Sequence, residues 1–370
     1  MKYRILHFVP GFDHGGIESR LIDWYHKIDR SKYQFDLLKL TPDDNNSLIM
    51  EFKTLGGNVY TIPKFNIKNY VKFRLELKKF FREHKYDAVH CHSPITGKFV
   101  LEEAQKSKIP IRIMHSRTVK FDTKSKFLFY REYLKKRVVS FSNTYFSCSK
   151  EAGEWMFGAK SSFKIINNGI RTDNFIFNLE TRQRVRKELN LKDSFVIGNV
   201  SRFTQSKNHD FLVDLLYEID NRGYNNCRLL LLGDGPTKMN IKERANEKGL
   251  LDKVVFLGKK ENVWDYYQAM DIFVFPSEFE GFGTVAVESQ ASGLKTIVST
   301  GVPMSVNITN LIKHLPLEIG IEDWADEVIK SFNYKRDNRR LDIINKGFDV
   351  STTVKELEII YSGNNNKPQD

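Results

Sequence analysis

Residues 272–288 have the sequence IFVFPSEFEGFGTVAVE. This stretch starts with an apolar run of aromatic and β-branched side chains, which predicts a short buried strand at 272–276. Gly281 and Gly283 then indicate a tight loop, and we expect a helix to begin at about Thr284. A strand that runs through a glycine loop into a helix is the repeating unit of parallel αβ sheets.

The same alternation of apolar strands and amphipathic helices continues on both sides of this unit. In the second half, further strands are expected at 195–200, 228–232, 254–257 and 296–299. In the first half, they are expected at 4–9, 35–40, 59–62, 88–92, 111–115 and 144–148. This order predicts an α/β protein with parallel sheets and crossover helices.

The length of 370 residues predicts two domains, since a domain has about 150 residues. A polar connection follows the sequence NNGI at 167–170, and we therefore expect an N-terminal domain at 1–165 and a C-terminal domain at 166–345. The last residues, 363–370, form a polar tail.

Composition and charge narrow the function classes. Hydrophobic residues make up 41% of the chain, which is enough for packed cores. The three cysteines form no CxxC pair, which favours a reducing cytoplasm over a disulfide framework or a zinc site. No apolar run reaches the roughly 18 residues of a membrane span. The net charge of +12 implies an anionic partner. A phosphorylated substrate and an acidic membrane are both compatible with it, whereas a nucleic-acid role would rest on charge alone, because no recognition motif is present.

Glu280 and Glu288 are separated by seven residues around the predicted loop. Free N–H groups and the dipole at the start of the helix favour an anion such as a diphosphate. Glu288, one turn inside the helix, is suited to accept the hydroxyls of a ribose, and Glu280 to reach the hydroxyls of a sugar. The plain alternative is a pair of surface glutamates around a tight turn.

Arg202 and Lys207 lie in one loop after the predicted strand at 195–200. Two cations in such a loop can neutralise a diphosphate and stabilise it as a leaving group, which Mg²⁺ does in metal-dependent transferases. An arginine and a lysine in a loop can also be merely solvated.

The segment from Phe273 to Ser277, the two glutamates and the sequence ASG at 291–293 together resemble the E-x7-E signature of the retaining glycosyltransferases of family 4. This resemblance implies the GT-B fold, in which two Rossmann-like domains face each other across a donor-binding cleft. It also implies a nucleotide-sugar donor, retention of the anomeric configuration, and no metal or other cofactor. Uridine is the default base from its frequency in the family, and the expected role is in bacterial capsule or exopolysaccharide synthesis.

The resemblance assigns site residues across almost the whole chain. It implies catalytic roles for His115, Glu280, Arg202 and Lys207. It implies substrate-binding roles for Gly15, Gly16, Arg202, Lys207, Gly233, Asn262, Val263, Glu280, Gly281, Phe282, Gly283, Thr284, Val285 and Glu288. It further implies that a C-terminal helix at about 346–362 packs back on the N-terminal domain, and that domain closure assembles the site.

The first domain departs from the family pattern after His115, which in the family points at the donor sugar. Where members often carry a second histidine or an asparagine, this chain has Ser116 and Arg117, and Arg117 is a candidate for an acceptor phosphate. His90 and His92 also end a predicted strand at the edge where parallel sheets bind ligands, and structural and ligand-binding roles are both open for them.

Residues 120–137 alternate bases with aromatic side chains. As a helix, this segment would present Phe127, Tyr130, Tyr133 and Leu134 on one face with basic residues beside them, which suits the surface of an acidic membrane. The ordinary alternative is an amphipathic helix packed on the sheet. With membrane contact, the acceptor would be a polyprenyl-diphosphate-linked sugar, and the protein would be cytoplasmic and peripheral on the inner face of the plasma membrane. The alternative function is a sugar-nucleotide-binding protein or epimerase that lacks transferase activity.

Overall fold

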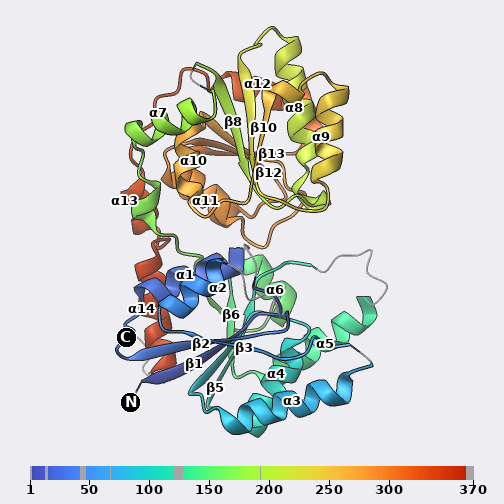
Figure 1. Cartoon of the computed structure of the whole chain (residues 1–370), viewed down its shortest axis with the longest axis vertical. Coiled ribbons are helices and arrows are strands. Elements are labelled where there is room, and N and C mark those ends of the chain that lie inside the picture. Colours follow the sequence, from blue (N-terminus) through green and yellow to red (C-terminus); the bar gives the residue numbers. More distant parts are fainter. Residues whose placement is uncertain are drawn as a thin grey trace. The chain divides into compact units, whose positions relative to one another are not determined.

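The computed structural model describes residues 2–12, 16–41, 47–66, 68–120, 128–191 and 193–363. Gly15, Phe127 with the rest of 121–127, and the tail from 364 therefore lie outside the described residues. The chain divides into two compact units (Figure 1). The first contains residues 1–169 and 348–370, and the second contains residues 170–347.

The first unit is built on a parallel sheet with the strand order β3-β2-β1-β4-β5-β6-β7. Its strands are β1 (Tyr3–Phe8), β2 (Tyr33–Lys39), β3 (Asn58–Thr61), β4 (Ala88–Cys91), β5 (Ile111–Ser116), β6 (Thr144–Ser147) and β7 (Lys164–Ile165). Its helices are α1 (Gly16–Lys27), α2 (Ser47–Thr54), α3 (Tyr70–Glu83), α4 (Gly97–Lys106), α5 (Leu128–Phe141), α6 (Lys150–Phe157) and α14 (Val350–Tyr361). The strand order reverses between β1 and β4, so the sheet has a topological switch point there.

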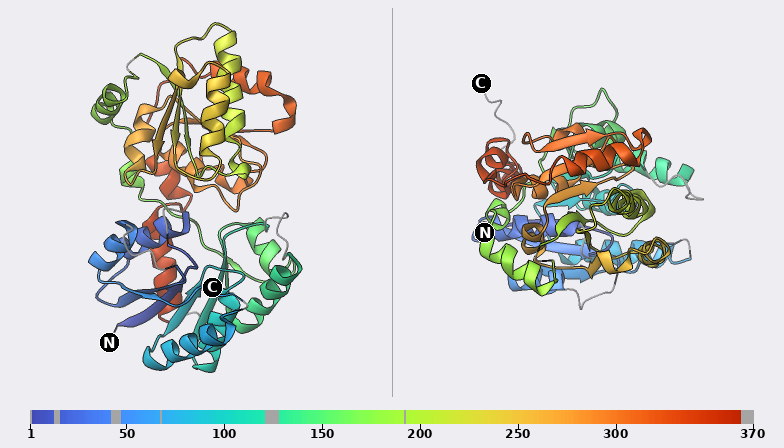
Figure 2. Two further views of the ribbon diagram at one scale, coloured as in Figure 1. Left: turned by 45° about the vertical axis from the view of Figure 1, so that its right-hand side comes forward. Right: turned by 90° about the horizontal axis from the view of Figure 1, so that it is seen from above.

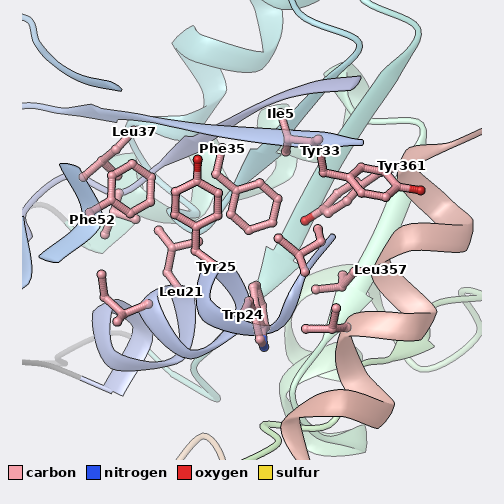
Figure 3. Close-up of a cluster of buried hydrophobic side chains, with 14 of the residues drawn as sticks. Ile5, Leu21, Trp24, Tyr25, Tyr33, Phe35, Leu37, Phe52, Leu357 and Tyr361 are labelled. Carbon is pink, nitrogen blue, oxygen red and sulfur yellow. The ribbon is translucent and has the colours of Figure 1, made fainter. Parts of the chain in front are cut away.

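Two cores cover the two faces of this sheet, because successive side chains of a strand point to opposite sides. In β1, Ile5 packs with α1, α2 and α14, whereas Leu6 packs with α3, α4 and α5. Figure 3 shows the first of these cores, in which Trp24 of α1 and Tyr361 of α14 lie near the strands. The last helix therefore completes the core of the first unit.

The C-terminal helix starts later than the sequence analysis expected. Residues 346–349 are outside it, and Asp349 caps α14 by accepting a hydrogen bond from the Ser351 N–H at 2.8 Å. An aspartate that caps a helix adopts an extended backbone and cannot itself be a helical residue. Helix α14 lies alongside α1. In both views of Figure 2, α14 is the red helix near the end of the chain.

The second unit also has a parallel sheet, in the order β10-β9-β8-β11-β12-β13. Its strands are β8 (Phe195–Val200), β9 (Cys227–Leu232), β10 (Val254–Gly258), β11 (Ile272–Phe275), β12 (Lys295–Ser299) and β13 (Ile312–Leu315). Its helices are α7 (Leu179–Glu188), α8 (His209–Asn221), α9 (Lys238–Glu247), α10 (Val263–Ala269), α11 (Thr284–Ala291), α12 (Ile321–Ile329) and α13 (Arg340–Asn345). Here the order reverses between β8 and β11.

Two Rossmann-like domains are therefore confirmed, and the predicted strands are all present. The sequence analysis missed β7 and β13, which are edge strands of two and four residues. The division between the units falls after residue 169, four residues beyond the expected position. Within the described ranges, no helix is long and apolar enough to cross a membrane.

Candidate active site

The switch point of the second unit brings together the two loops that the sequence analysis singled out. The loop after β8 carries Arg202 and Lys207, and the loop after β11 carries Glu280. In open parallel sheets, ligands bind outside the carboxyl ends of the strands at such a switch point. Because β8 and β11 are hydrogen-bonded neighbours, residues 73 positions apart in the chain become partners.

Lys207 and Glu280 form an ion pair at this edge. The Lys207 ammonium donates a hydrogen bond to Glu280 Oε1 and lies 5.3 Å from the centre of the Phe275 ring. The hydroxyl of Ser277 donates to the same carboxylate oxygen at 2.8 Å, and the Glu280 N–H donates to the Gly301 carbonyl at 2.9 Å. Both side chains are mostly buried, so the pair is held in a defined position.

The loop ends at Gly283, which has φ +93° and forms the N-cap of α11. Only glycine adopts this left-handed conformation without strain, and it turns the chain directly from the loop into the helix. Phe282 is buried beneath the turn, whereas Gly281, Thr284 and Val285 are partly exposed. The first turn of α11 thus presents its backbone N–H groups near the carboxyl edge of β11, as an anion site requires.

Glu288 lies one turn inside α11 and is 6% exposed. Its Oε2 accepts a hydrogen bond from the Tyr267 hydroxyl of α10 at 3.1 Å. Tyr267 is fully buried and was not among the predicted site residues. Glu288 is therefore a positioned carboxylate, and the interpretation of the two glutamates as solvated surface residues is wrong.

Arg202 is exposed, and no ion pair involves it within the described part of the chain. The turn at Gly233 packs against the loop that carries Arg202. Gly233 has φ +134°, and a Cβ at this position would lie 2.0 Å from the Ser201 carbonyl oxygen. The Phe203 N–H donates to the Asp234 carbonyl at 3.0 Å. Gly233 thus lies against the backbone of the Arg202 loop.

Asn262 and Val263 begin α10 at the same end of the sheet. Asn262 precedes the helix, and its side chain donates to Asp265 at 2.9 Å. Both residues are partly exposed.

In the first unit, four buried histidines lie at the carboxyl ends of three adjacent strands. His7 of β1 is in register with His90 of β4, and His115 of β5 and His92 complete the group. These side chains lie on the face covered by α1 and α14, and the indole of Trp24 lies within 6.4 Å of all four rings.

The histidines are joined in hydrogen-bonded chains. His90 Nε2 and His115 Nδ1 are 2.9 Å apart, and His90 Nδ1 is 2.6 Å from the Tyr361 hydroxyl. Burial lowers the pKa of His115 well below its usual value, as it does for His90, and the charge of Arg117 adds to the effect for both. The imidazoles of His90 and His115 are therefore neutral.

Gly16, the other predicted site residue of the first unit that the structure describes, is exposed at the start of α1.

Within the described residues, one group of side chains has the composition of a metal site, namely His7, His90 and His92, whose ligand atoms lie within 4.8 Å of one another. It does not fit a cation well. Both nitrogens of His90 are engaged, and its ring stacks on that of His92 at 4.4 Å, so their lone pairs do not converge. The Arg117 guanidinium also lowers the pKa of these rings, and it would repel a metal ion.

Comparisons with known proteins identify the family of the chain. Residues 14–174 match the family model for glycosyltransferase family 4, and residues 181–347 match that for glycosyl transferases group 1. The chain belongs to glycosyltransferase family 4. This glycosyltransferase is 29% identical to the putative glycosyltransferase EpsF of Bacillus subtilis, over 97% of this chain and 96% of the relative. It is 25% identical to the capsular polysaccharide biosynthesis glycosyltransferase CapH of Staphylococcus aureus, over 97% and 98%.

Solved structures place the glycosyltransferase in the GT-B fold. HepE of Anabaena, solved in complex with UDP and glucose, has a TM-score of 0.78 over 98% of this chain and all of that one, at 16% identity. WaaG, a glycosyltransferase involved in lipopolysaccharide biosynthesis, has a TM-score of 0.71 over 97% of this chain and all of that one, at 13% identity. The predicted family, fold and enzyme class are therefore confirmed.

The predicted site residues fall into two groups. Arg202, Lys207, Gly233, Glu280 and Glu288, with the remaining loop and helix positions, lie in the second unit, whereas Gly16 and His115 lie in the first. Tyr267, Ser277, Trp24 and Tyr361 were missed. A single hydroxyl or indole carries no sequence signal of its own, although the alternate spacing of His90 and His92 at the end of a predicted strand was visible.

Proposed function

We propose that this glycosyltransferase moves a sugar from a UDP-sugar to a glycan acceptor linked to a lipid diphosphate, with retention and without a metal ion. The observation that carries the proposal is the Lys207–Glu280 ion pair beside the first turn of α11. It combines a cation, a carboxylate and a helix N-terminus at one switch point.

The relatives support the choice of substrates. One of them is named the UDP-Gal:alpha-D-GlcNAc-diphosphoundecaprenol alpha-1,3-galactosyltransferase of Escherichia coli, at 24% identity over 79% of both chains. CapH is named for capsular polysaccharide biosynthesis, and HepE was solved with UDP and glucose. These names favour a UDP-sugar donor and a role in cell-surface polysaccharide synthesis.

In the proposed reaction, Arg202 and Lys207 bind the donor diphosphate together with the N–H groups of α11. As Lys207 turns to the phosphate oxygens, Glu280 becomes available to the hydroxyls of the sugar. Glu288, held by Tyr267, accepts the ribose hydroxyls. The bond between the anomeric carbon and the phosphate oxygen breaks, the acceptor oxygen bonds to that carbon on the same face, and the phosphate oxygen takes the acceptor proton. The two cations stabilise the charge on the departing diphosphate.

A donor screen tests this proposal. The purified protein is titrated with UDP, GDP and a panel of UDP- and GDP-sugars in EDTA, and thermal stabilisation and slow release of the diphosphate are measured. We expect one uridine series to stabilise the wild type and Lys207→Ala to lose that stabilisation. Lys330→Ala is the matched control, because Lys330 pairs with Glu327 on an exposed surface.

Other outcomes distinguish the alternatives. Release of nucleotide only when Mg²⁺ is added would contradict the metal-free mechanism. Conversion of a UDP-sugar to its epimer, with no transfer to any acceptor, would support the epimerase alternative. No stabilisation by any nucleotide would contradict the donor site.

A basic and aromatic surface on α5 supports contact with an acidic membrane. Phe129 is 96% exposed, and Tyr130 and Tyr133 are also exposed, with their ring centres 6.4 Å apart. Lys136 and Arg137 are exposed on the same helix. Leu134 packs in the core. The prediction that Leu134 shares an exposed face with the two tyrosines is therefore wrong. We propose that this surface holds the cytoplasmic enzyme at the membrane that carries its acceptor.

Vesicle flotation tests the membrane contact. We expect binding to vesicles of phosphatidylglycerol, weaker binding to phosphatidylcholine alone, and loss of binding in the Phe129→Ser, Tyr133→Ser double variant. The matched control is Met239→Ser, which removes a side chain of similar exposure from the second unit. Equal binding to both lipids would contradict a role for the basic residues.

A further inference from the structure

The guanidinium of Arg117 is buried at Nε and Nη2. Arg117 follows β5 directly, and its guanidinium carbon lies 5.1 Å from the centre of the Trp24 ring. Its Nη1 donates to the side-chain oxygen of Asn168, whereas Nε and Nη2 are buried and have no hydrogen-bond partner among the described residues. Within the described ranges of the chain, no carboxylate forms an ion pair with it. Burial lowers the pKa of Arg117 to about 10, so the side chain remains charged at neutral pH.

The described side chains beside Arg117 provide donors, and the carboxylate of Glu18 acts on its charge without forming an ion pair with it. In the described part of the chain, the buried indole Nε1 of Trp24 and the buried Nε2 of His115 have no hydrogen-bond partner. The neighbouring imidazoles are neutral, and they offer the guanidinium no compensation.

The second unit shows how this protein satisfies a buried arginine when the role is structural. Nη1 of Arg186 donates to the carboxylate of Asp271 at 3.1 Å and to the Ala269 carbonyl at 2.7 Å, and Nη2 donates to the Ser194 carbonyl. An arginine that lacks such partners lowers the stability of the fold, because a charge removed from water must be paired. Arg117 is therefore arranged for a ligand.

The free edge of the guanidinium defines the ligand chemistry. Nε–H and Nη2–H lie on one side of the planar group and form the parallel pair of donors that binds an oxyanion in two-point fashion. Arg117 as a whole is partly exposed and follows the carboxyl end of β5, whereas Nε and Nη2 themselves are buried.

We propose that Arg117, supported by Trp24, is the receptor for a phosphoryl group of the acceptor. This inference rests on the proposed function, in which the donor diphosphate is bound by Arg202 and Lys207 of the second unit. The anion at Arg117 is then a second one, and the lipid-linked acceptor carries it. Arg117 selects acceptors that have a diphosphate next to the sugar and discriminates against neutral glycans.

The test uses inorganic pyrophosphate as the probe, with the full-length protein saturated with UDP to fill the donor site. Binding is measured by calorimetry. We expect the wild type to bind pyrophosphate, and Arg117→Met to lose at least tenfold in affinity. Arg82→Met, which removes an exposed arginine from α3, is expected to bind as the wild type does. Arg117→Lys keeps the charge but not the two-point edge and should bind with intermediate affinity.

Thermal melting separates this role from a structural one. Because Arg117→Met removes an unpaired charge and keeps the stem against Trp24, we expect the variant without ligand to melt at the same temperature as the wild type or above it. A large decrease in melting temperature would overturn the proposal. It would also be overturned if pyrophosphate bound equally to wild type and Arg117→Met, or if binding were lost in Lys207→Ala instead. Competition by glucuronate but not by phosphate would assign a carboxylate and overturn the phosphoryl class.

The proposed function fails separately. Binding of UDP to the wild type and its loss in Lys207→Ala test the donor site alone. An Arg117-dependent pyrophosphate site in a protein that binds no nucleotide would contradict the proposed function and leave the anion receptor standing.

Discussion

Tyr361, at the end of the last helix, forms a hydrogen bond of 2.6 Å with Nδ1 of His90, a residue 271 positions earlier in the chain. Burial raises the pKa of the Tyr361 phenol well above its usual value, so the hydroxyl keeps its proton. If this proton is donated to His90, then His90 Nε2–H donates to His115 Nδ1, and His115 Nε2 carries a hydrogen. The reverse order would leave the phenol proton without an acceptor. Helix α14 thus sets the tautomer of His115 through His90.

We expect Tyr361→Phe to destabilise the protein by about 1–3 kcal/mol, because the buried Nδ1 of His90 loses its partner. Urea unfolding measures the change in stability, and ¹⁵N chemical shifts of the imidazoles report the tautomer of His115. Tyr334→Phe is the matched control, since the buried hydroxyl of Tyr334 has no hydrogen-bond partner among the residues that the structure describes. An unchanged His115 tautomer in Tyr361→Phe would contradict the positioning role.

The buried histidines make the stability depend on pH. Burial lowers the pKa of His7 from 6.5 to about 3, and the pKa of His92 is also well below its usual value. Below pH 6.5 the unfolded chain therefore binds more protons than the folded one. The stabilisation is complete above that pH and is lost as the pH falls. Each such histidine contributes about 1.4 kcal/mol per pH unit between roughly pH 6 and 4.

Unfolding in urea at pH 7.5, 6.0 and 5.0 checks this dependence. His92→Phe retains a ring of similar shape and removes one titrating group. As the pH falls, the free energy of unfolding of this variant should therefore decrease by about 1.4 kcal/mol per pH unit less than that of the wild type. The same slope in wild type and variant would show that His92 titrates normally in the folded protein.

Glu280→Gln is expected to reduce the rate of sugar transfer by about 10²–10³-fold. The neutral amide cannot form the ion pair with Lys207, and it binds the hydroxyls of the sugar more weakly than the carboxylate does. Steady-state transfer with the donor identified by the screen measures the loss. The fold should be unaffected, since Ser277 still has a hydrogen-bond acceptor at the amide oxygen. Glu278→Gln is the control, because Glu278 is exposed next to the same turn. Transfer at the wild-type rate in Glu280→Gln would rule out this residue.

Gly233→Ala is expected to destabilise the second unit by about 2 kcal/mol more than Gly223→Ala. Both glycines have positive φ, at +134° and +89°, so an alanine is strained at either position. Of these two positions, only Gly233 would place the new Cβ against backbone, 2.0 Å from the Ser201 carbonyl oxygen. At Gly223, no atom of the described residues lies within 4 Å of the new Cβ. Urea unfolding compares the two. Equal losses would mean that the contact between the Gly233 turn and the Arg202 loop is not rigid.

Much of the donor half of the site was visible in the sequence. Glu280, Gly283 and Glu288 lie within nine residues, and a strand, a glycine turn and a helix start leave such a segment few conformations. The same holds for Arg202 and Lys207, which share one loop after a predicted strand. Local chemistry and spacing determined these positions, and the parallel sheets followed from the alternation of apolar strands with helices.

The tertiary structure decided which of these groups meet. The Lys207–Glu280 pair requires β8 and β11 to be neighbours, and the Glu288–Tyr267 bond requires α10 to lie against α11. Likewise, the Tyr361–His90 bond depends on the return of α14 to the first unit. The unpaired edge of Arg117 is a property of its whole surroundings. Spacing along a chain limits only local geometry, whereas contacts between distant residues depend on strand order and on the packing of helices against the sheet.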